Sequence, residues 1–327
     1  MSSNDRRNKV FVTRKIPEAG INMLKKHHEV VVSPHNRVLT TSELINGIKN
    51  ADGLLCLLTD PITAEVMDAN PELKVISNYA VGYNNIDVVA ATARGIQVTN
   101  TPGVLTDTTA DLAWSLIMAV GRRVVEGDVF TRAGRFSGWD PMLLLGSDIT
   151  GKTLGIIGMG RIGQAVARRA MGFDMPILYH DVAPMAQVEE EYHAQFAGLD
   201  ELLKESDFVT IHAPLTPETR HMIGQHELRL MKKTAYLINT ARGPLVDEHA
   251  LVEALKEGAI AGAGLDVYED EPELAPGLAE LPNIVLLPHL GSATLETRTK
   301  MAEMAAANLL AALKGKRPPH IVNPEVL

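Results

Sequence analysis

Several features of secreted, membrane and nucleic-acid-binding proteins are missing from this sequence of 327 residues. Cys56 is its only cysteine, so no disulfide can form within the chain, and a reducing compartment is favoured over secretion. No segment approaches the roughly 18 consecutive apolar residues of a membrane-spanning helix, and the polar residues 1–9 lack the apolar core of a signal peptide. The formal net charge of -9, without a long basic run, argues against nucleic acid as a partner. We therefore expect a cytoplasmic protein that binds neither membranes nor nucleic acid.

The composition is that of an ordinary globular protein, with 46% hydrophobic and 22% charged residues. The chain is longer than the roughly 100 to 200 residues of a typical domain, so we expect two domains with separate cores. Cys56 lies between Leu55 and Leu57, and we interpret it as a buried core thiol.

Short β-rich runs alternate with helical patterns through the first third of the chain. This alternation predicts a parallel sheet covered by helices on both faces. The predicted strands are residues 10–12, 30–32, 53–57, 74–77 and 97–99, and the predicted helices are residues 17–27, 41–49 and 86–94. The pair Pro102-Gly103 interrupts the rhythm, and we place the first domain boundary there.

A strongly apolar helix is predicted next, at residues 105–120. Apolar side chains cover more than one of its faces, so it must be buried, either within the chain or against a second subunit. A loop leads to a second alternating series, from a strand at 152–157 to one at 284–287. The last predicted helix, 295–313, makes the first domain discontinuous if it packs back on that domain. The whole pattern predicts an α/β protein with two doubly wound parallel sheets.

Gly158, Gly160 and Gly163 have the spacing of a dinucleotide-binding loop. They follow an apolar strand at 153–157 and open a helix, whose N-terminus favours a pyrophosphate. The next predicted strand ends at Asp181, which lies 23 residues after Gly158, close to the roughly 20 expected for the acidic residue that binds the adenosine ribose. The motif predicts NAD as the cofactor.

Three polar residues follow predicted strands at the carboxyl edge of the second sheet, where ligands bind in such folds. Arg242 can hold a carboxylate through a planar pair of hydrogen bonds, although an arbitrary arginine is more often part of a surface salt bridge. His289 can give or take a proton near neutral pH, as carbonyl reduction by hydride transfer requires. Glu271, if it lies nearby, would stabilise the imidazolium and fix the ring.

Four segments together resemble the D-isomer-specific 2-hydroxyacid dehydrogenase family over nearly the whole chain: residues 158–163, 239–243, 266–272 and 288–294. The resemblance implies a Rossmann-type nucleotide domain at residues 103–292 and a flavodoxin-like substrate domain at residues 1–102 and 293–327. It places Arg242, Glu271 and His289 on the catalytic positions of the family. It also implies that Val81 and Gly82 offer backbone N–H groups to the substrate carboxylate.

The predicted site combines these residues with their neighbours, and it contains no metal. The predicted cofactor-binding residues are Gly158, Gly160, Arg161, Ile162, Gly163, Asp181, Thr109, Ala213, Pro214, Thr240, Ala241, Asp266 and Gly291. The predicted substrate-binding residues are Val81, Gly82, Arg242, His289, Ser292 and Trp139.

Within the family, residues 55–60, 104–110 and Trp139 with residues 142–146 resemble the glyoxylate and hydroxypyruvate reductases. This implies hydride transfer from NADH to a small 2-keto acid, and a homodimer. The apolar run 139–145 resembles a segment that lies against the partner subunit's active site, although burial within its own subunit would also explain it. NADPH-preferring members generally carry a neutral or basic residue where this chain has Asp181, so we expect a preference for NADH.

Two other interpretations stay open at this point. The first is another dehydrogenase of the family, although a formate enzyme is expected to have glutamine where Glu271 stands, and many phosphoglycerate enzymes are longer. The second is a non-catalytic, NAD-sensing corepressor, because the same fold serves both purposes.

Overall fold

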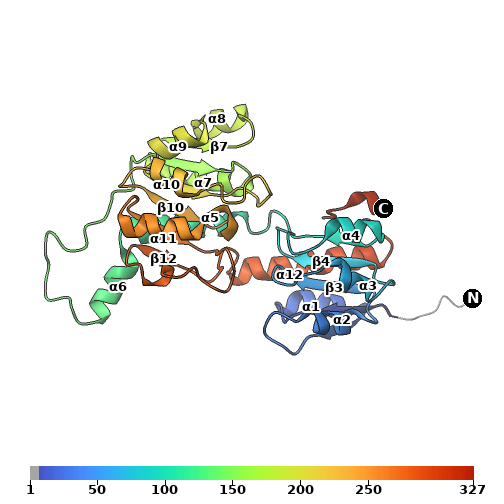
Figure 1. The fold of residues 1–327 in the computed structure, drawn as a ribbon. Helices are drawn as coiled ribbons and strands as arrows, with labels where there is room; N and C mark the ends of the chain where they lie inside the picture. Colours follow the sequence, from blue (N-terminus) through green and yellow to red (C-terminus); the bar gives the residue numbers. More distant parts are fainter. Residues whose placement is uncertain (1–6) are drawn as a thin grey trace, which may run out of the picture. The chain divides into compact units, whose positions relative to one another are not determined.

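The computed structural model describes residues 7–327. The chain divides into two compact units, one formed by residues up to Leu105 together with Ser292–Leu327, and the other by Thr106–Gly291. Both units consist of a parallel sheet with helices on its faces (Figure 1). The predicted fold class, an α/β protein with two doubly wound parallel sheets, is confirmed.

The first unit is built on a five-stranded sheet in the order β2-β1-β3-β4-β5, which is the flavodoxin-like order. Its strands are β1 (Lys9–Val12), β2 (Glu29–Val32), β3 (Gly53–Leu57), β4 (Val75–Tyr79) and β5 (Gln97–Thr99). Its helices are α1 (Glu18–Lys25), α2 (Thr41–Ile48), α3 (Ala64–Asp68), α4 (Val88–Ala93) and α12 (Leu295–Leu313).

Helix α12 belongs to the core of this first unit although it comes from the end of the chain. It packs against α1 and β4, and the hydroxyl of Ser77 donates a hydrogen bond to the carbonyl of Ala305 at 2.9 Å. A Cβ on Gly20 would collide with the backbone of Ala302, so glycine lets the two helices approach closely. Cys56 is fully buried and free, as predicted.

The second unit is built on a seven-stranded sheet in the order β12-β11-β10-β9-β6-β7-β8. Its strands are β6 (Leu154–Ile157), β7 (Ile177–His180), β8 (Ala194–Phe196), β9 (Phe208–Ile211), β10 (Tyr236–Asn239), β11 (Gly262–Leu265) and β12 (Ile284–Leu286). Its helices are α5 (Thr106–Gly121), α6 (Val124–Arg132), α7 (Arg161–Ala170), α8 (Ala186–Tyr192), α9 (Leu199–Glu205), α10 (Gln225–Leu230) and α11 (Glu248–Glu257).

The strand order of the second unit reverses at β6, because β7 lies on one side of it and β9 on the other. Such a switch point is where ligands bind in doubly wound sheets. Helix α5 packs against α7 and lies over β10 and β11, so burial within the chain accounts for its apolar faces. Trp114 of this helix donates its indole N–H to the carbonyl of Val166 in α7 at 3.2 Å.

Helix α6 corrects the sequence prediction, which had a loop between the apolar helix and the second sheet. Ion pairs spaced at helical intervals stabilise it locally, Arg123 with Glu126 at 2.8 Å and Arg132 with Asp128 at 2.8 Å. None of its residues is buried, so the burial pattern that marks other helices is absent. Helix α6 and the segment after it project from the rest of the second unit (Figure 1).

Among residues 7–327, no helix combines the length and apolar character needed to cross a membrane.

Candidate active site

Three neighbouring parallel strands of the second unit end beside the predicted catalytic residues. Arg242 comes shortly after β10, Glu271 lies in the segment between β11 and β12, and His289 comes shortly after β12. Because these strands are parallel and adjacent, their carboxyl ends form one edge of the sheet. The fold therefore carries these side chains on the ligand-binding edge.

His289 and Glu271 form a hydrogen-bonded pair, with Nδ1 of the ring 2.9 Å from Oε2 of the carboxylate. The other carboxylate oxygen accepts the backbone N–H of Tyr268 at 3.1 Å. Burial acts to raise the pKa of Glu271, but the hydrogen bond and charge of His289, the Tyr268 N–H and the charge of Arg242 outweigh it and lower that pKa. Glu271 is thus held as a carboxylate that fixes the ring through Nδ1, and Nε2 has no protein partner among residues 7–327.

The backbone at His289 has φ +56°, a left-handed conformation that side-chain-bearing residues seldom adopt. Asp266 holds this turn in place. Its backbone carbonyl accepts the N–H of His289 at 3.0 Å, and its carboxylate accepts the N–H groups of Leu290 at 2.6 Å and Gly291 at 2.8 Å. Burial raises the pKa of Asp266, against the effect of these N–H donors. The strained turn therefore rests on a fully buried acid.

Arg242 is held by the turn after β10. Asn239 donates its side-chain amide to the carbonyl of Arg242 at 2.9 Å and accepts the N–H of Ala241 at 3.0 Å. One guanidinium nitrogen donates to the carbonyl of Ala241 at 2.6 Å. Burial lowers the pKa of Arg242 while the charge of Glu271 acts to raise it, and a guanidinium stays charged in either case. The group remains a cation with donors to spare for an anionic substrate.

Glu248 holds the loop that carries Glu271, and sequence reasoning missed it. Its side chain is buried and accepts the backbone N–H groups of Glu269 at 2.6 Å and Ala275 at 3.3 Å, one on each side of Glu271. Burial raises the pKa of Glu248. In the sequence, Glu248 appears only as an acidic residue in the first turn of α11, after the cap Asp247, which is an ordinary place for a glutamate.

The glycine-rich loop between β6 and α7 fits a dinucleotide. Gly158 has φ +92°, and a Cβ on it would lie 2.5 Å from the backbone nitrogen of Ala213. A Cβ on Gly163 would collide with the carbonyl of Gly158, whereas a Cβ on Gly160 would meet nothing within 4 Å. The first and third glycines thus permit tight packing, and the second leaves the backbone open to a pyrophosphate at the start of α7.

Asp181, at the end of β7, is tied directly to this loop. Its Oδ2 accepts the N–H of Met159 at 2.7 Å, and its Oδ1 accepts the N–H of Val182 at 2.7 Å. Each carboxylate oxygen can accept a second hydrogen bond, so both remain able to bind ribose hydroxyls. The residues that the sequence assigned to the pyrophosphate and to the ribose therefore lie together.

The other predicted cofactor residues lie on the same unit. Arg161 and Ile162 are in the first turn of α7, Ala213 and Pro214 follow β9, and Thr240 and Ala241 follow β10. Thr109, in α5, donates its hydroxyl to the carbonyl of Gly291 at 2.9 Å. The hydroxyl of Thr240 is buried without a hydrogen-bond partner in the part of the chain that the structure describes, which leaves it available to a ligand.

Four predicted substrate residues lie on the first unit or away from the catalytic edge. Val81 and Gly82 follow β4 in the first unit, and both are half-buried. Ser292 accepts a hydrogen bond from the guanidinium of Arg298 at 3.1 Å. Trp139 lies in the segment after α6 and is 85% exposed, so burial within its own subunit does not explain it.

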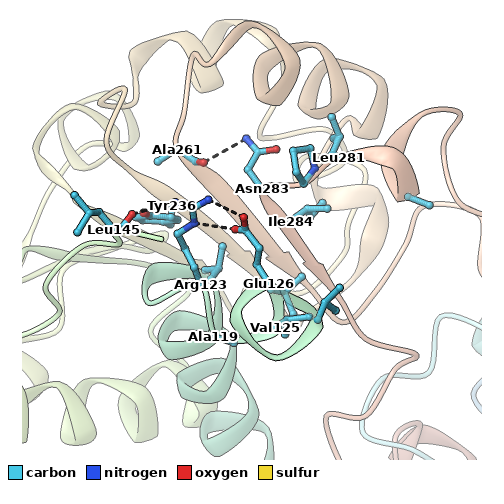
Figure 2. A pocket seen from close by; sticks show the side chains of 15 residues that line it. Ala119, Arg123, Val125, Glu126, Leu145, Tyr236, Ala261, Leu281, Asn283 and Ile284 are labelled. Carbon is cyan, nitrogen blue, oxygen red and sulfur yellow. Dashed lines mark hydrogen bonds and ion pairs between the residues drawn. The ribbon is translucent and has the colours of Figure 1, made fainter. Parts of the chain in front are cut away.

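A pocket of about 670 Å³ in the second unit lies at the other edge of the sheet, where β10, β11 and β12 begin. Tyr236, Ala261 and Ile284 line it from the sheet, and α6 covers one side with Arg123 and Glu126 (Figure 2). Its lining is mostly apolar and lacks all three predicted catalytic residues. This pocket is therefore separate from the candidate active site.

Comparison with known proteins agrees with this geometry. Residues 114–291 match the family model described as D-isomer specific 2-hydroxyacid dehydrogenase, NAD binding domain. A glyoxylate reductase from Thermococcus gammatolerans is 54% identical over 323 residues, covering 98% of this chain and 97% of that protein. A second glyoxylate reductase, from Pyrococcus furiosus, is 52% identical and covers 98% of this chain and 96% of that protein.

A solved structure is similarly close over nearly the whole chain. The NADPH-dependent glyoxylate/hydroxypyruvate reductase of Sinorhizobium meliloti, in complex with NADP and malonate, has a TM-score of 0.85 at 34% identity and covers 97% of each chain. The family model spans more than half of the chain, and the identities to curated relatives exceed one half. The chain therefore belongs to the D-isomer specific 2-hydroxyacid dehydrogenase family, as its sequence motifs predicted.

Proposed function

We propose that this protein reduces glyoxylate or hydroxypyruvate to the corresponding 2-hydroxy acid, with NADH as the preferred cofactor. The observation that carries the proposal is the pair formed by Glu271 and His289 at the ligand-binding edge that also carries Arg242. The relatives named glyoxylate reductase, which are more than half identical to the chain, support the substrate class.

A bound nicotinamide would supply the hydride, and the chain's own residues bind, orient and protonate the substrate. Nδ1 of His289 is occupied by Glu271, so Nε2 is the nitrogen that donates a proton to the developing alkoxide. The guanidinium of Arg242 binds the carboxylate and polarises the carbonyl through paired N–H donors. The N–H groups of Val81 and Gly82 bind the carboxylate.

The preference for NADH rests on Asp181. Its carboxylate lies against the loop that receives the pyrophosphate, and it has acceptor capacity for ribose hydroxyls. The 2'-phosphate of NADPH would bring negative charge against it. The relative from Sinorhizobium meliloti is described as NADPH-dependent, so cofactor choice is a property in which this chain would differ from it.

A homodimer is the second part of the proposal. Helix α6 and the following segment carry exposed apolar side chains, with Val124 55%, Val129 54%, Trp139 85% and Met142 73% exposed. The pocket in Figure 2 lies against the same helix. Several large apolar side chains exposed on one helix and on the segment after it are typical of an interface. A second copy of the chain covers it, and Trp139 of each copy lies against the active site of the other.

The test of the activity is a substrate panel with the purified protein. NADH oxidation, followed by absorbance, is measured with glyoxylate, hydroxypyruvate, pyruvate and branched or aromatic 2-keto acids. We expect the highest kcat/KM with glyoxylate or hydroxypyruvate. A higher value for a branched or aromatic acid would contradict the substrate assignment, and NADH binding without turnover of any keto acid would identify a non-catalytic NAD-binding protein.

The test of the dimer uses sedimentation equilibrium on the wild type and on Val129→Glu, which puts a charge on the apolar surface. We expect a dimer for the wild type and a shift towards monomers for the variant. Trp139→Ala is expected to raise KM for the keto acid without changing the Kd for NADH. A monomeric wild type, or an unchanged KM in Trp139→Ala, contradicts this part of the proposal.

A further inference from the structure

The loop after β4 presents its peptide groups in fixed orientations. The carbonyl of Val81 accepts a hydrogen bond from the side-chain amide of Asn100 at 2.7 Å, and the carbonyl of Gly82 accepts one from the side-chain amide of Asn78 at 2.8 Å. Asn78 lies within β4, and Asn100 directly follows the neighbouring strand β5. Two adjacent strand ends of one sheet thus supply donors to two successive carbonyls.

A third carbonyl is held in the same way, because that of Ala80 accepts the backbone N–H of Thr101 at 2.8 Å. A trans peptide group is planar, and its N–H points opposite to its C=O. The bond from Thr101 to Ala80 therefore determines where the N–H of Val81 points. By the same geometry, the bond from Asn100 to Val81 determines where the N–H of Gly82 points.

Neither of these two N–H groups has a protein partner in the described part of the chain. Within residues 7–327, neither the N–H of Val81 nor that of Gly82 donates a backbone hydrogen bond, although both residues are half-buried. Two successive N–H groups that lack a protein partner and have fixed directions can together bind one external acceptor, such as an anion.

The two asparagines are themselves held firmly. The carbonyl of Asn100 accepts the side-chain amide of Asn308, from α12, at 2.9 Å. Asn78 is fully buried, and its amide also donates to the side-chain oxygen of Asn85 at 3.2 Å. Asn85 in turn donates to the carbonyls of Leu57 at 3.0 Å and Asp60 at 3.1 Å. The anchors therefore connect the loop to β3 and α12, so the loop cannot rotate its peptides without breaking buried hydrogen bonds.

We propose that Asn100 is a positioning residue for the substrate carboxylate, and that Asn78 supports it by closing the same loop. Asn100 does not touch the substrate. It binds the carbonyl of Val81, so that the N–H of Gly82 already points at the site of the carboxylate before substrate arrives. The inference rests on the proposed function, in which Val81 and Gly82 bind that carboxylate.

The experiment compares Asn100→Ala with the wild type and with a matched control, Asn70→Ala. Asn70 is also a buried asparagine of the first unit, and its amide donates to the carbonyls of Ile48 and Ala51 at 2.7 Å each, at the opposite edge of the sheet, before β3 begins. Each variant removes a side-chain amide that donates to backbone carbonyls. Only Asn100→Ala frees a peptide of the predicted substrate loop.

Three quantities are measured: KM and kcat for glyoxylate, the Kd of oxamate in the presence of NADH, and the Kd of NADH alone. For Asn100→Ala we expect KM and the oxamate Kd to rise about 10-fold or more. The variant no longer orients the N–H of Gly82, which donates a hydrogen bond to the charged carboxylate. The fall in kcat is expected to be smaller, and the Kd of NADH unchanged. Asn70→Ala is expected to lower the melting temperature while leaving KM and the oxamate Kd at their wild-type values.

A second variant covers the case in which Asn100→Ala does not fold. Asn100→Asp keeps the shape of the side chain but turns an acceptor towards the carbonyl of Val81, so an equal or larger rise in the oxamate Kd is expected. If neither variant differs from Asn70→Ala in oxamate binding, the inference is wrong. Oxamate binding does not need turnover, so a wild type that binds oxamate but reduces no keto acid would overturn the proposed function and not this inference.

Discussion

The preference for NADH can be tested at a single carboxylate. In Asp181→Asn, one oxygen becomes an amide NH₂, which cannot accept hydrogen bonds. The two oxygens of Asp181 accept the N–H groups of Met159 and Val182 at 2.7 Å, so the variant also turns a donor towards one of these donors. We therefore expect a loss of at least one ribose hydrogen bond and a looser glycine-rich loop.

The magnitude follows from the charge of the acceptor. A hydrogen bond to a charged group contributes about 1.5 to 3 kcal/mol, so NADH is expected to bind roughly 10-fold to 150-fold more weakly. For NADPH the change also removes a repulsion, which for two unit charges about 4 Å apart is about 4 kcal/mol at an effective dielectric constant near 20, before screening by salt. Weaker binding of NADH and relief of the NADPH repulsion both lower the ratio of kcat/KM with NADH to kcat/KM with NADPH. We expect that ratio to narrow by about 100-fold or more, through weaker use of NADH together with better use of NADPH.

The assay is steady-state kcat/KM with NADH and NADPH at saturating keto acid, for the wild type, Asp181→Asn and Asp181→Ser. Asp200→Asn is the matched control, because Asp200 is an exposed acid in the first turn of α9, in the same unit. We expect the control to keep the wild-type ratio. Equal or better use of NADPH by the wild type would refute the reasoning, and so would an unchanged ratio in Asp181→Asn.

Four further predictions concern the catalytic edge and its supports. His289→Ala should lower kcat by about 10²-fold to 10⁴-fold through loss of the general acid, and Arg242→Ala should also raise KM for the keto acid; folded variants with near wild-type turnover would remove these residues from the mechanism. Glu271→Gln should move the acid limb of the pH profile for 2-hydroxy acid oxidation to lower pH, because a neutral amide no longer stabilises the imidazolium, whereas a shift to higher pH would contradict the pairing. Glu248→Gln should lower kcat about 10-fold to 100-fold and, like Glu271→Gln, move the acid limb of the pH profile to lower pH. A loss of stability without that shift would show that Glu248 supports the fold and does not position Glu271. Burial lowers the pKa of His212 from 6.5 to about 3, so its contribution to stability is complete above pH 6.5 and falls as the pH drops towards 3. About 2 kcal/mol should be lost at pH 5, and urea unfolding of His212→Gln should depend less on pH between 8 and 5 than that of the wild type.

Much of the fold follows from local sequence patterns. The alternation of short apolar runs with helical periodicity predicted two doubly wound parallel sheets, and both are present. The predicted helix at 295–313 coincides with α12. Helix α6 was not predicted. Its valines are not buried in the chain, so the helix lacks the buried apolar face by which a helix is usually recognised.

The sequence also identified part of the candidate site, where local motifs carry its residues. The spacing of Gly158, Gly160 and Gly163 and the placement of Asp181 can be recognised in the sequence because a tight turn and an anion site need particular residues at particular intervals. The motifs around Arg242 and His289 are equally local, since each lies at a strand end. The family assignment followed from these motifs and is confirmed.

Only the tertiary structure identified the residues that hold the loops of the site in place. Glu248 holds the loop of Glu271, Asp266 holds the left-handed turn at His289, and Asn100 holds the carbonyl of Val81. Each of these bonds joins residues that are 19 or more positions apart in the chain. A glutamate in a first helical turn or an asparagine after a strand has many ordinary explanations in a sequence, and no local pattern distinguishes them. Which backbone group such a side chain meets depends on how the strands are ordered in the sheet, because the order brings distant loops to one edge.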